Sequence, residues 1–194
     1  DTLQETVVYQ IDKDLGFKGT DLNYIVWHGL ADNPIILQPI TFALNDLNGN
    51  GAFLIGTVWQ DKSSYVRLYD ISIKSNPQMR LYKIPTPEYY FFAKAVQKNH
   101  PIDNGDIRIQ DAVLLDGKIA FIFTSGLQDR HFSRINFNVL DLSSLTVQSR
   151  LLGDNVNYSY AFPSIGLISN KEEPASFFVL YNGTSDNSFP DIRY

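Results

Sequence analysis

An internal repeat restricts the fold of this chain more than any other feature. Three segments open with a short strand-like stretch, a tight turn and a strongly apolar stretch, then continue through an Asp-containing loop into a stretch that carries an arginine. The segments are residues 37–73, 108–142 and 161–194. The first two copies add a fourth strand-like stretch, residues 78–86 and 146–153. A repeat of this kind indicates that one supersecondary unit recurs in series.

Short runs rich in Val, Ile, Phe, Tyr and Thr, broken by Gly, Asn, Asp and Pro, predict an all-β chain. Four antiparallel strands per unit are typical of a β-propeller blade, and complete rings hold roughly four to eight blades. We therefore predict a β-propeller segment of about three four-stranded blades that belongs to a larger ring. A β-sandwich is the alternative, and the internal repeat argues against it.

The repeat also suggests boundaries within one propeller domain fragment. Residues 1–36 are interpreted as the end of a preceding blade, because residues 6–12 and 23–27 have the composition of strands. Residues 37–100 and 101–153 form one blade each, and residues 154–194 form an incomplete blade. We expect the rest of the parent chain or another subunit to complete the ring.

Composition narrows the classes of partner. The net charge is −5 with 16 basic residues, and these form no cluster of the kind that binds nucleic acid or an anionic membrane. No apolar run has the length needed to span a bilayer, so we expect no membrane insertion. The chain has no cysteine, which excludes disulfides and thiolate zinc sites.

The second half of the chain carries a family resemblance. The stretch "IDNGDIRIQDAVLLDGKIAF", followed by "SRINFNVLDL", "YAFPSIGLISN" and "YNGTSDNSFPDIRY", resembles large bacterial secreted or cell-surface proteins with sialidase-like propellers. The matching motifs are a Gly-Asp-x-Arg segment before a strand and an aromatic-Pro-Ser-Ile strand. The resemblance covers residues 101–194 and implies a propeller fold and an extracellular or cell-surface location. It implies no reaction, because this group has no assigned activity.

One candidate binding site lies at the entrance of the second repeat. Asp103, Asp106, Arg108 and Asp111 precede or begin a predicted innermost strand, where propeller ligands usually bind. Strand alternation places Arg108 and Gln110 on one face. The alternative is a local Asp-Arg network that orders the loop between blades, and we favour this alternative over acid–base catalysis.

A second candidate is a calcium site in the segment "DLNGNG". Asp46, Asn48 and Asn50 offer oxygen ligands at positions 1, 3 and 5 of a loop with glycine at position 6. Position 12 is Thr57 where an EF-hand has glutamate. The favoured interpretation is a hairpin turn in which Asn and Gly supply positive φ angles. We expect no other cofactor.

The repeated arginines suggest a hydrolase alternative. Sialidases bind the carboxylate of their substrate with three arginines, and Arg67, Arg134 and Arg193 recur at one position of each repeat. Because equivalent positions of three blades lie apart, we expect each arginine to pair with an acidic group of its own blade. The Asp boxes of sialidases are missing.

We therefore expect a non-catalytic extracellular or cell-surface β-propeller that acts in binding or as a scaffold. A carbohydrate or a surface protein is its expected ligand. One alternative is a sialidase-like glycoside hydrolase. Another is a structural subunit of a large surface assembly.

Overall fold

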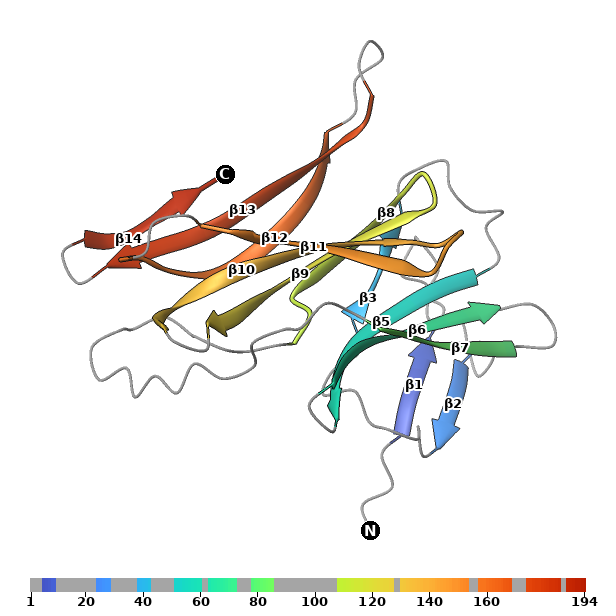
Figure 1. The fold of residues 1–194 in the computed structure, drawn as a ribbon. Coiled ribbons are helices and arrows are strands. Elements are labelled where there is room, and N and C mark those ends of the chain that lie inside the picture. Colours follow the sequence, from blue (N-terminus) through green and yellow to red (C-terminus); the bar gives the residue numbers. More distant parts are fainter. Residues whose placement is uncertain are drawn as a thin grey trace. The chain divides into compact units, whose positions relative to one another are not determined.

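The computed structural model describes residues 5–9, 24–28, 38–42, 51–60, 63–72, 78–85, 108–127, 130–153, 157–168, 174–185 and 188–194. Every regular element in these ranges is a β-strand (Figure 1). The prediction of an all-β chain with antiparallel sheets is confirmed. Among the described residues, no helix is both long enough and apolar enough to cross a membrane.

The chain divides into two compact units, Asp1–Asn33 and Pro34–Tyr194. The first unit contains β1 (Glu5–Tyr9) and β2 (Tyr24–His28), which pair antiparallel. Both strands coincide closely with strand-like stretches of the sequence. The second unit contains three sheets, which we number in chain order.

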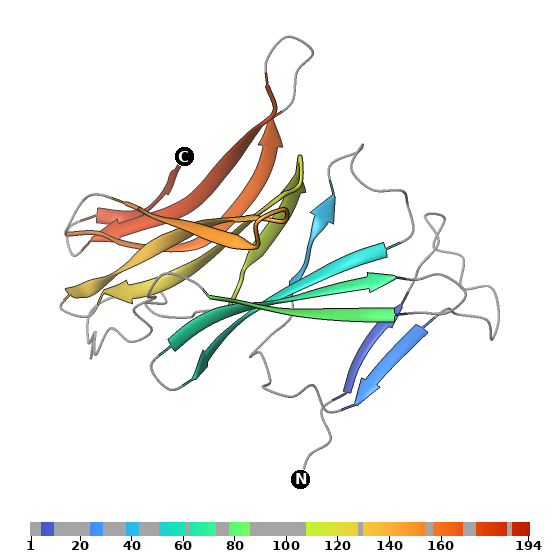
Figure 2. The ribbon, with the colours of Figure 1, turned by 45° about the vertical axis from the view of Figure 1, so that its right-hand side comes forward.

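Sheet 1 has the strand order β3-β5-β6-β7, and all its neighbours are antiparallel (Figure 2). Its strands are β3 (Gln38–Pro39), β5 (Gly51–Gln60), β6 (Ser63–Ser72) and β7 (Gln78–Pro85). The short β3 occupies the position predicted for the first strand of the repeat. The last strand, β7, coincides with the predicted fourth strand.

Sheet 2 follows the same plan in the order β8-β9-β10-β11. Its strands are β8 (Asp111–Leu115), β9 (Lys118–Leu127), β10 (Arg130–Asp141) and β11 (Thr146–Leu152). Asp116 and Gly117 join β8 to β9 with φ angles of 48° and 71°. Positive φ at both central residues is the geometry of a two-residue hairpin turn. The tight turn expected after the first strand of the second repeat is therefore found at these two residues.

A short strand from the first repeat also joins sheet 2. The strand β4 (Thr41–Phe42) pairs parallel with β8, with Thr41 opposite Val113. The first strand of one repeat therefore lies beside the first strand of the next.

Sheet 3 has the order β12-β13-β14, again antiparallel (Figure 1). Its strands are β12 (Ser159–Ile168), β13 (Ser176–Ser185) and β14 (Ser188–Arg193). The register between β12 and β13 shifts between Ala161 and Ser164, and Phe162 in this bulge has a φ of 53°. Positive φ is uncommon for an aromatic residue, and a bulge redirects its side chain.

Two hydrophobic cores join the three sheets, because successive strand residues point to opposite faces. Along β9, Phe121 belongs to the core shared with sheet 1, where Ile55 and Leu68 pack. Its neighbour Ile122 belongs to the core shared with sheet 3, where Tyr160 and Ile165 pack. Residues 119–125 of β9 are buried without interruption, since sheet 2 is covered on both faces.

Candidate functional site

The predicted binding residues at the start of the second repeat are partly described. Arg108 is exposed and lies in a bend three residues before β8, and Asp111 is the first residue of that strand. Asp103 and Asp106 lie outside the described residues. The predicted calcium ligands Asp46, Asn48 and Asn50 also lie outside them.

Asp111 uses both of its carboxylate oxygens within the chain. One oxygen accepts a hydrogen bond from the backbone N–H of Ala112 at 2.9 Å. The other accepts from the hydroxyl of Ser164 at 2.8 Å and from the backbone N–H of Ile165 at 2.9 Å. Since Ser164 and Ile165 belong to β12, Asp111 ties the first strand of sheet 2 to the first strand of sheet 3. This contact between Asp111 and β12 was not predicted from the sequence.

A cluster of tyrosines and arginines forms a second polar region at the contact between sheets 2 and 3. Tyr158 stacks on Tyr160 with ring centroids 6.1 Å apart, and Tyr160 meets Tyr181 edge-on at 5.5 Å. The guanidinium of Arg134 lies 5.5 Å from the centre of the Tyr160 ring, and that of Arg193 lies 5.3 Å from the Tyr158 ring. We call these five residues the tyrosine cluster.

Arg134 and Arg193 therefore lie over two tyrosine rings that stack on each other. The repeat had led us to expect that these two arginines lie apart, each in its own blade. Arg193 forms the expected pair within its own sheet, at 2.9 and 2.6 Å from the two carboxylate oxygens of Asp191. This hydrogen-bonded pairing raises the pKa of Arg193. The side chain of Arg67 lies outside the described part of the structure.

Arg134 is almost completely buried. It donates to the backbone carbonyl of Ser133 at 2.8 Å and to that of Tyr158 at 2.6 Å. Ser133 adds two more contacts between the sheets, because its hydroxyl donates to the Tyr160 carbonyl and accepts from the Tyr160 N–H. These hydrogen bonds provide partners for buried polar groups at the edge of β12. Polar groups inside proteins are usually hydrogen-bonded in this way.

Two glycines make room for the ring of Tyr160. A Cβ atom on Gly153, whose φ is 90°, would lie 2.4 Å from two carbons of this ring. A Cβ on Gly183 would lie 3.1 Å from it. Glycine is therefore needed at residue 153 for both the backbone angle and the close approach. The Tyr-x-Tyr spacing at residues 158–160 places both rings on one face of an extended chain, and this spacing could have indicated the stacked pair.

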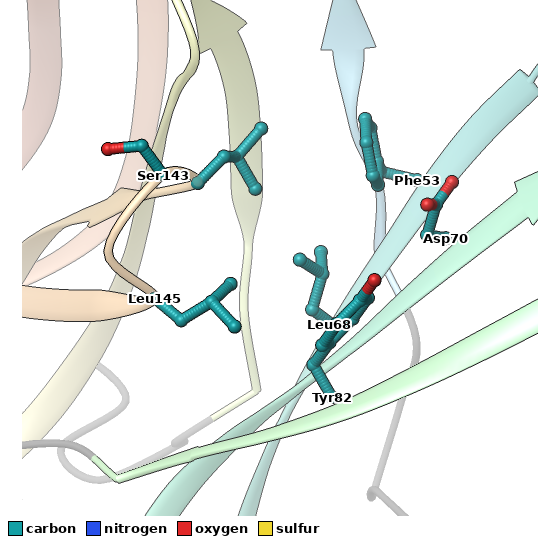
Figure 3. Close-up of a pocket in the computed structure, with 7 residues that line it drawn as sticks. Phe53, Leu68, Asp70, Tyr82, Ser143 and Leu145 are labelled. Carbon is teal, nitrogen blue, oxygen red and sulfur yellow. The ribbon is translucent and has the colours of Figure 1, made fainter.

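A cavity of about 240 Å³ lies between sheet 1 and the turn that joins β10 to β11 (Figure 3). Phe53 is opposite Asp70, and Leu68 is opposite Tyr82, so these four side chains share one face of sheet 1. Figure 3 shows Leu145 directed toward Leu68 and Tyr82. The complete lining is Phe53, Leu68, Asp70, Tyr82, Leu142, Ser143 and Leu145.

This cavity is smaller than typical ligand pockets, which measure roughly 300–1,000 Å³. Phe53, Tyr82 and Leu142 also pack against the core between sheets 1 and 2. The cavity is thus an open end of that core, with one carboxylate, Asp70, on its wall. Arg80 stands opposite Asp70 in the strand register.

The turn beside the cavity is held by Asp141. One carboxylate oxygen accepts hydrogen bonds from the hydroxyl and the N–H of Ser143, at 2.5 and 2.8 Å, and from the N–H of Ser144 at 3.1 Å. The hydroxyl bond of Ser143 is the largest of the effects that lower the pKa of Asp141 from 3.8 to about 2. Asp141 therefore remains ionised at neutral pH and organises the turn.

The described residues contain no group of three or more His, Cys, Asp or Glu side chains that could hold a metal ion. No protein-family model matches the chain, and a search of curated proteins and of solved structures found no match.

Proposed function

We propose that this chain is a segment of an extracellular or cell-surface β-propeller that acts in binding or as a scaffold, without catalysis. The observation that carries the proposal is the way in which the three sheets follow one another. Apart from β4, which pairs parallel with β8, the strands of each sheet follow one another antiparallel in chain order, and each sheet packs on the next through an apolar face. Serial sheets of this kind are the building plan of a propeller.

The first strands of successive sheets support the same arrangement. The strand β4 pairs with β8, and Asp111 of β8 bonds to Ser164 and Ile165 of β12. In a propeller the first strands of neighbouring blades lie side by side around the axis. A sandwich would instead require two sheets that enclose one core, whereas this unit has two cores separated by sheet 2.

The contacts of the arginines argue against the sialidase-like alternative. Arg134 is buried against carbonyl oxygens and a tyrosine ring, and Arg193 is paired with Asp191. An arginine that binds a substrate carboxylate must present its N–H groups to the ligand. Both arginines instead direct their N–H groups at atoms of the chain itself.

The entrance of β8 is the proposed ligand contact. Arg108 is exposed there, three residues from the Asp111 carboxylate that ties two sheets together. A charged side chain held beside a rigid junction can bind an acidic carbohydrate or a protein loop with little loss of conformational freedom.

A glycan array tests this proposal when it is combined with a hydrolysis assay on a fluorogenic sialoside. We expect retention of acidic glycans without release of the fluorophore, and weaker retention for Arg108→Ala. Arg150→Ala is the matched control, because Arg150 is exposed on β11 of the same sheet. Release of the fluorophore would favour the sialidase-like alternative. Equal loss of retention in both variants would remove Arg108 from the site.

A further inference from the structure

The cavity between sheet 1 and the β10–β11 turn combines apolar walls with a carboxylate. Among its described lining residues, Asp70 is the only Asp, Glu, Lys, Arg or His. Asp70 is half-buried, and Leu68 beside it on β6 is almost fully buried. A carboxylate set among apolar side chains attracts a positive charge more strongly than one that is surrounded by water. The cavity wall therefore favours a cation.

Aromatic rings beside Asp70 favour the same kind of ligand. Phe53 of β5 stands directly opposite Asp70, and Tyr82 of β7 stands opposite Leu68, so the rings and the carboxylate share one face of sheet 1. Figure 3 shows the Asp70 carboxylate next to the Phe53 ring. The face of an aromatic ring attracts cations, and Lys, Arg and ligand ammonium groups bind in this way.

The surroundings of Asp70 leave its carboxylate accessible to a ligand. Ser143 also lines the cavity, but its hydroxyl donates to Asp141, and Figure 3 shows that hydroxyl directed away from Phe53. Within the described part of the chain, no residue forms a hydrogen bond or an ion pair with the Asp70 side chain. Arg80 stands opposite Asp70 in the strand register, and its side chain lies outside the described residues.

The size of the cavity limits the ligand to a small molecule. Its volume is about 240 Å³, whereas an apolar protein cavity of about 150 Å³ is large enough to bind benzene. The cavity therefore has room for one six-membered ring and an ammonium group. Leu142 and Leu145 supply an apolar wall for such a ring. Because Asp141 holds their turn by three hydrogen bonds, this wall is formed before a ligand arrives.

We propose that this cavity binds a small organic cation, namely a protonated amine carried on a single apolar ring. The ammonium group pairs with the Asp70 carboxylate, and the ring packs among Leu68, Tyr82 and Leu145. Figure 3 shows the Leu145 side chain directed toward the other two. The site lies on sheet 1 and the β10–β11 turn and does not include Arg108, so it is independent of the ligand contact proposed above.

NMR of the methyl-labelled chain, titrated with benzylamine at neutral pH, tests this site. Benzylamine is protonated under these conditions. We expect saturable shifts of the methyl signals of Leu68, Leu142 and Leu145, with a Kd of about 1 mM or lower, which a ligand of about eight non-hydrogen atoms can reach. Benzyl alcohol has the same shape without the charge and should bind at least about tenfold more weakly.

Variants assign the binding to the groups that the cavity presents. Asp70→Asn should weaken benzylamine binding by at least about tenfold. Asp191→Asn makes the same change of charge on β14 of sheet 3 and is the matched control. Tyr82→Leu removes an aromatic face and should weaken binding about two- to fivefold. Arg80→Gln removes a cation from the strand beside Asp70 and should leave binding equal or tighter.

A lysine model compound, acetyl-lysine methylamide with a free side-chain amine, distinguishes a free ring-bearing amine from a lysine of a protein partner. We expect it to bind more weakly than benzylamine, because its thin stem fills less of the cavity. Tighter binding of this compound would overturn the proposal. The absence of saturable shifts, equal binding of benzyl alcohol, or equal weakening by Asp191→Asn would do the same. Circular dichroism checks the folding of each variant, and the comparison of benzylamine with benzyl alcohol needs only the wild-type chain.

Discussion

Sheets 2 and 3 share a strand plan but differ in what covers them. Both begin with a first strand, continue through an antiparallel neighbour and add a third strand. Sheet 2 lies between two hydrophobic cores, and the middle of β9 is buried on both faces. Sheet 3 contributes one face to a core, and on its other face Ile168, Leu180 and Ile192 are exposed. An isoleucine on the third strand of a sheet therefore becomes core or surface according to what packs against it.

The sharpest test of this comparison uses one residue type on the third strand of each sheet. Ile135 is fully buried in sheet 2, and Ile192 is 71% exposed in sheet 3. Ile135→Ala should lower the free energy of unfolding by about 2–5 kcal/mol, because it leaves a cavity. Ile192→Ala should change it by less than about 0.5 kcal/mol at low protein concentration. Urea titration followed by fluorescence measures both, and equal losses would show that the two positions are not distinguished by burial.

The next prediction concerns the join between the two sheets. Gly153→Ala would place a methyl group against the Tyr160 ring and force alanine to adopt a φ of 90°. We expect a loss of about 2–4 kcal/mol in the free energy of unfolding.

Gly117→Ala is the control for the backbone angle alone, because φ is 71° there and a Cβ atom meets nothing within 4 Å. This change should cost about 1 kcal/mol. If thermal unfolding gave the same loss for both variants, contact with Tyr160 would not be the reason for Gly153.

A smaller effect is expected from the tie between the first strands. Asp111→Ala removes the acceptor for Ser164, Ile165 and Ala112, and should cost about 1–3 kcal/mol. A double-mutant cycle with Ser164→Ala isolates the contact between the two side chains. We expect a coupling energy of about 0.5–1 kcal/mol. Additive losses would mean that these side chains do not stabilise the contact between sheets 2 and 3.

The smallest predicted effect is confined to sheet 2 and depends on pH. Folding lowers the pKa of Asp141 from 3.8 to about 2, so the ionised carboxylate favours the folded state. This contribution is complete above pH 3.8 and disappears as pH falls to about 2. The melting temperatures of wild type and Asp141→Asn should therefore differ at pH 5 and converge near pH 2. A difference that stays constant across this interval would contradict the role of the charge.

Local chemistry explains why much of the fold could be predicted from the sequence. The dipeptide Asp116-Gly117 indicates a two-residue turn, because both residues tolerate positive φ. The strands on either side of it follow from runs of Val, Ile and Phe. The fourth strands of sheets 1 and 2 were also predicted within a residue or two, because polar and proline-containing breaks bound them.

The candidate sites were predicted less completely, because their partners come from distant parts of the chain. Asp111 was identified as a notable carboxylate, but its bonds to Ser164 and Ile165 span more than fifty residues. Arg134 was matched to Arg193 by repeat position, yet the two arginines meet on stacked tyrosines. The residues that neighbour Asp111, Arg134 and Arg193 in the sequence do not indicate these long-range contacts.

The sequence by itself determined the strands, their turns and their serial order, because those depend on neighbouring residues and on the two-residue alternation of a strand. Alternation shows that Phe121 and Ile122 face opposite ways, but it does not say which sheet lies on each side. Only the tertiary structure decided that Ile135 would be buried and Ile192 exposed, because burial depends on whether another sheet packs against that face.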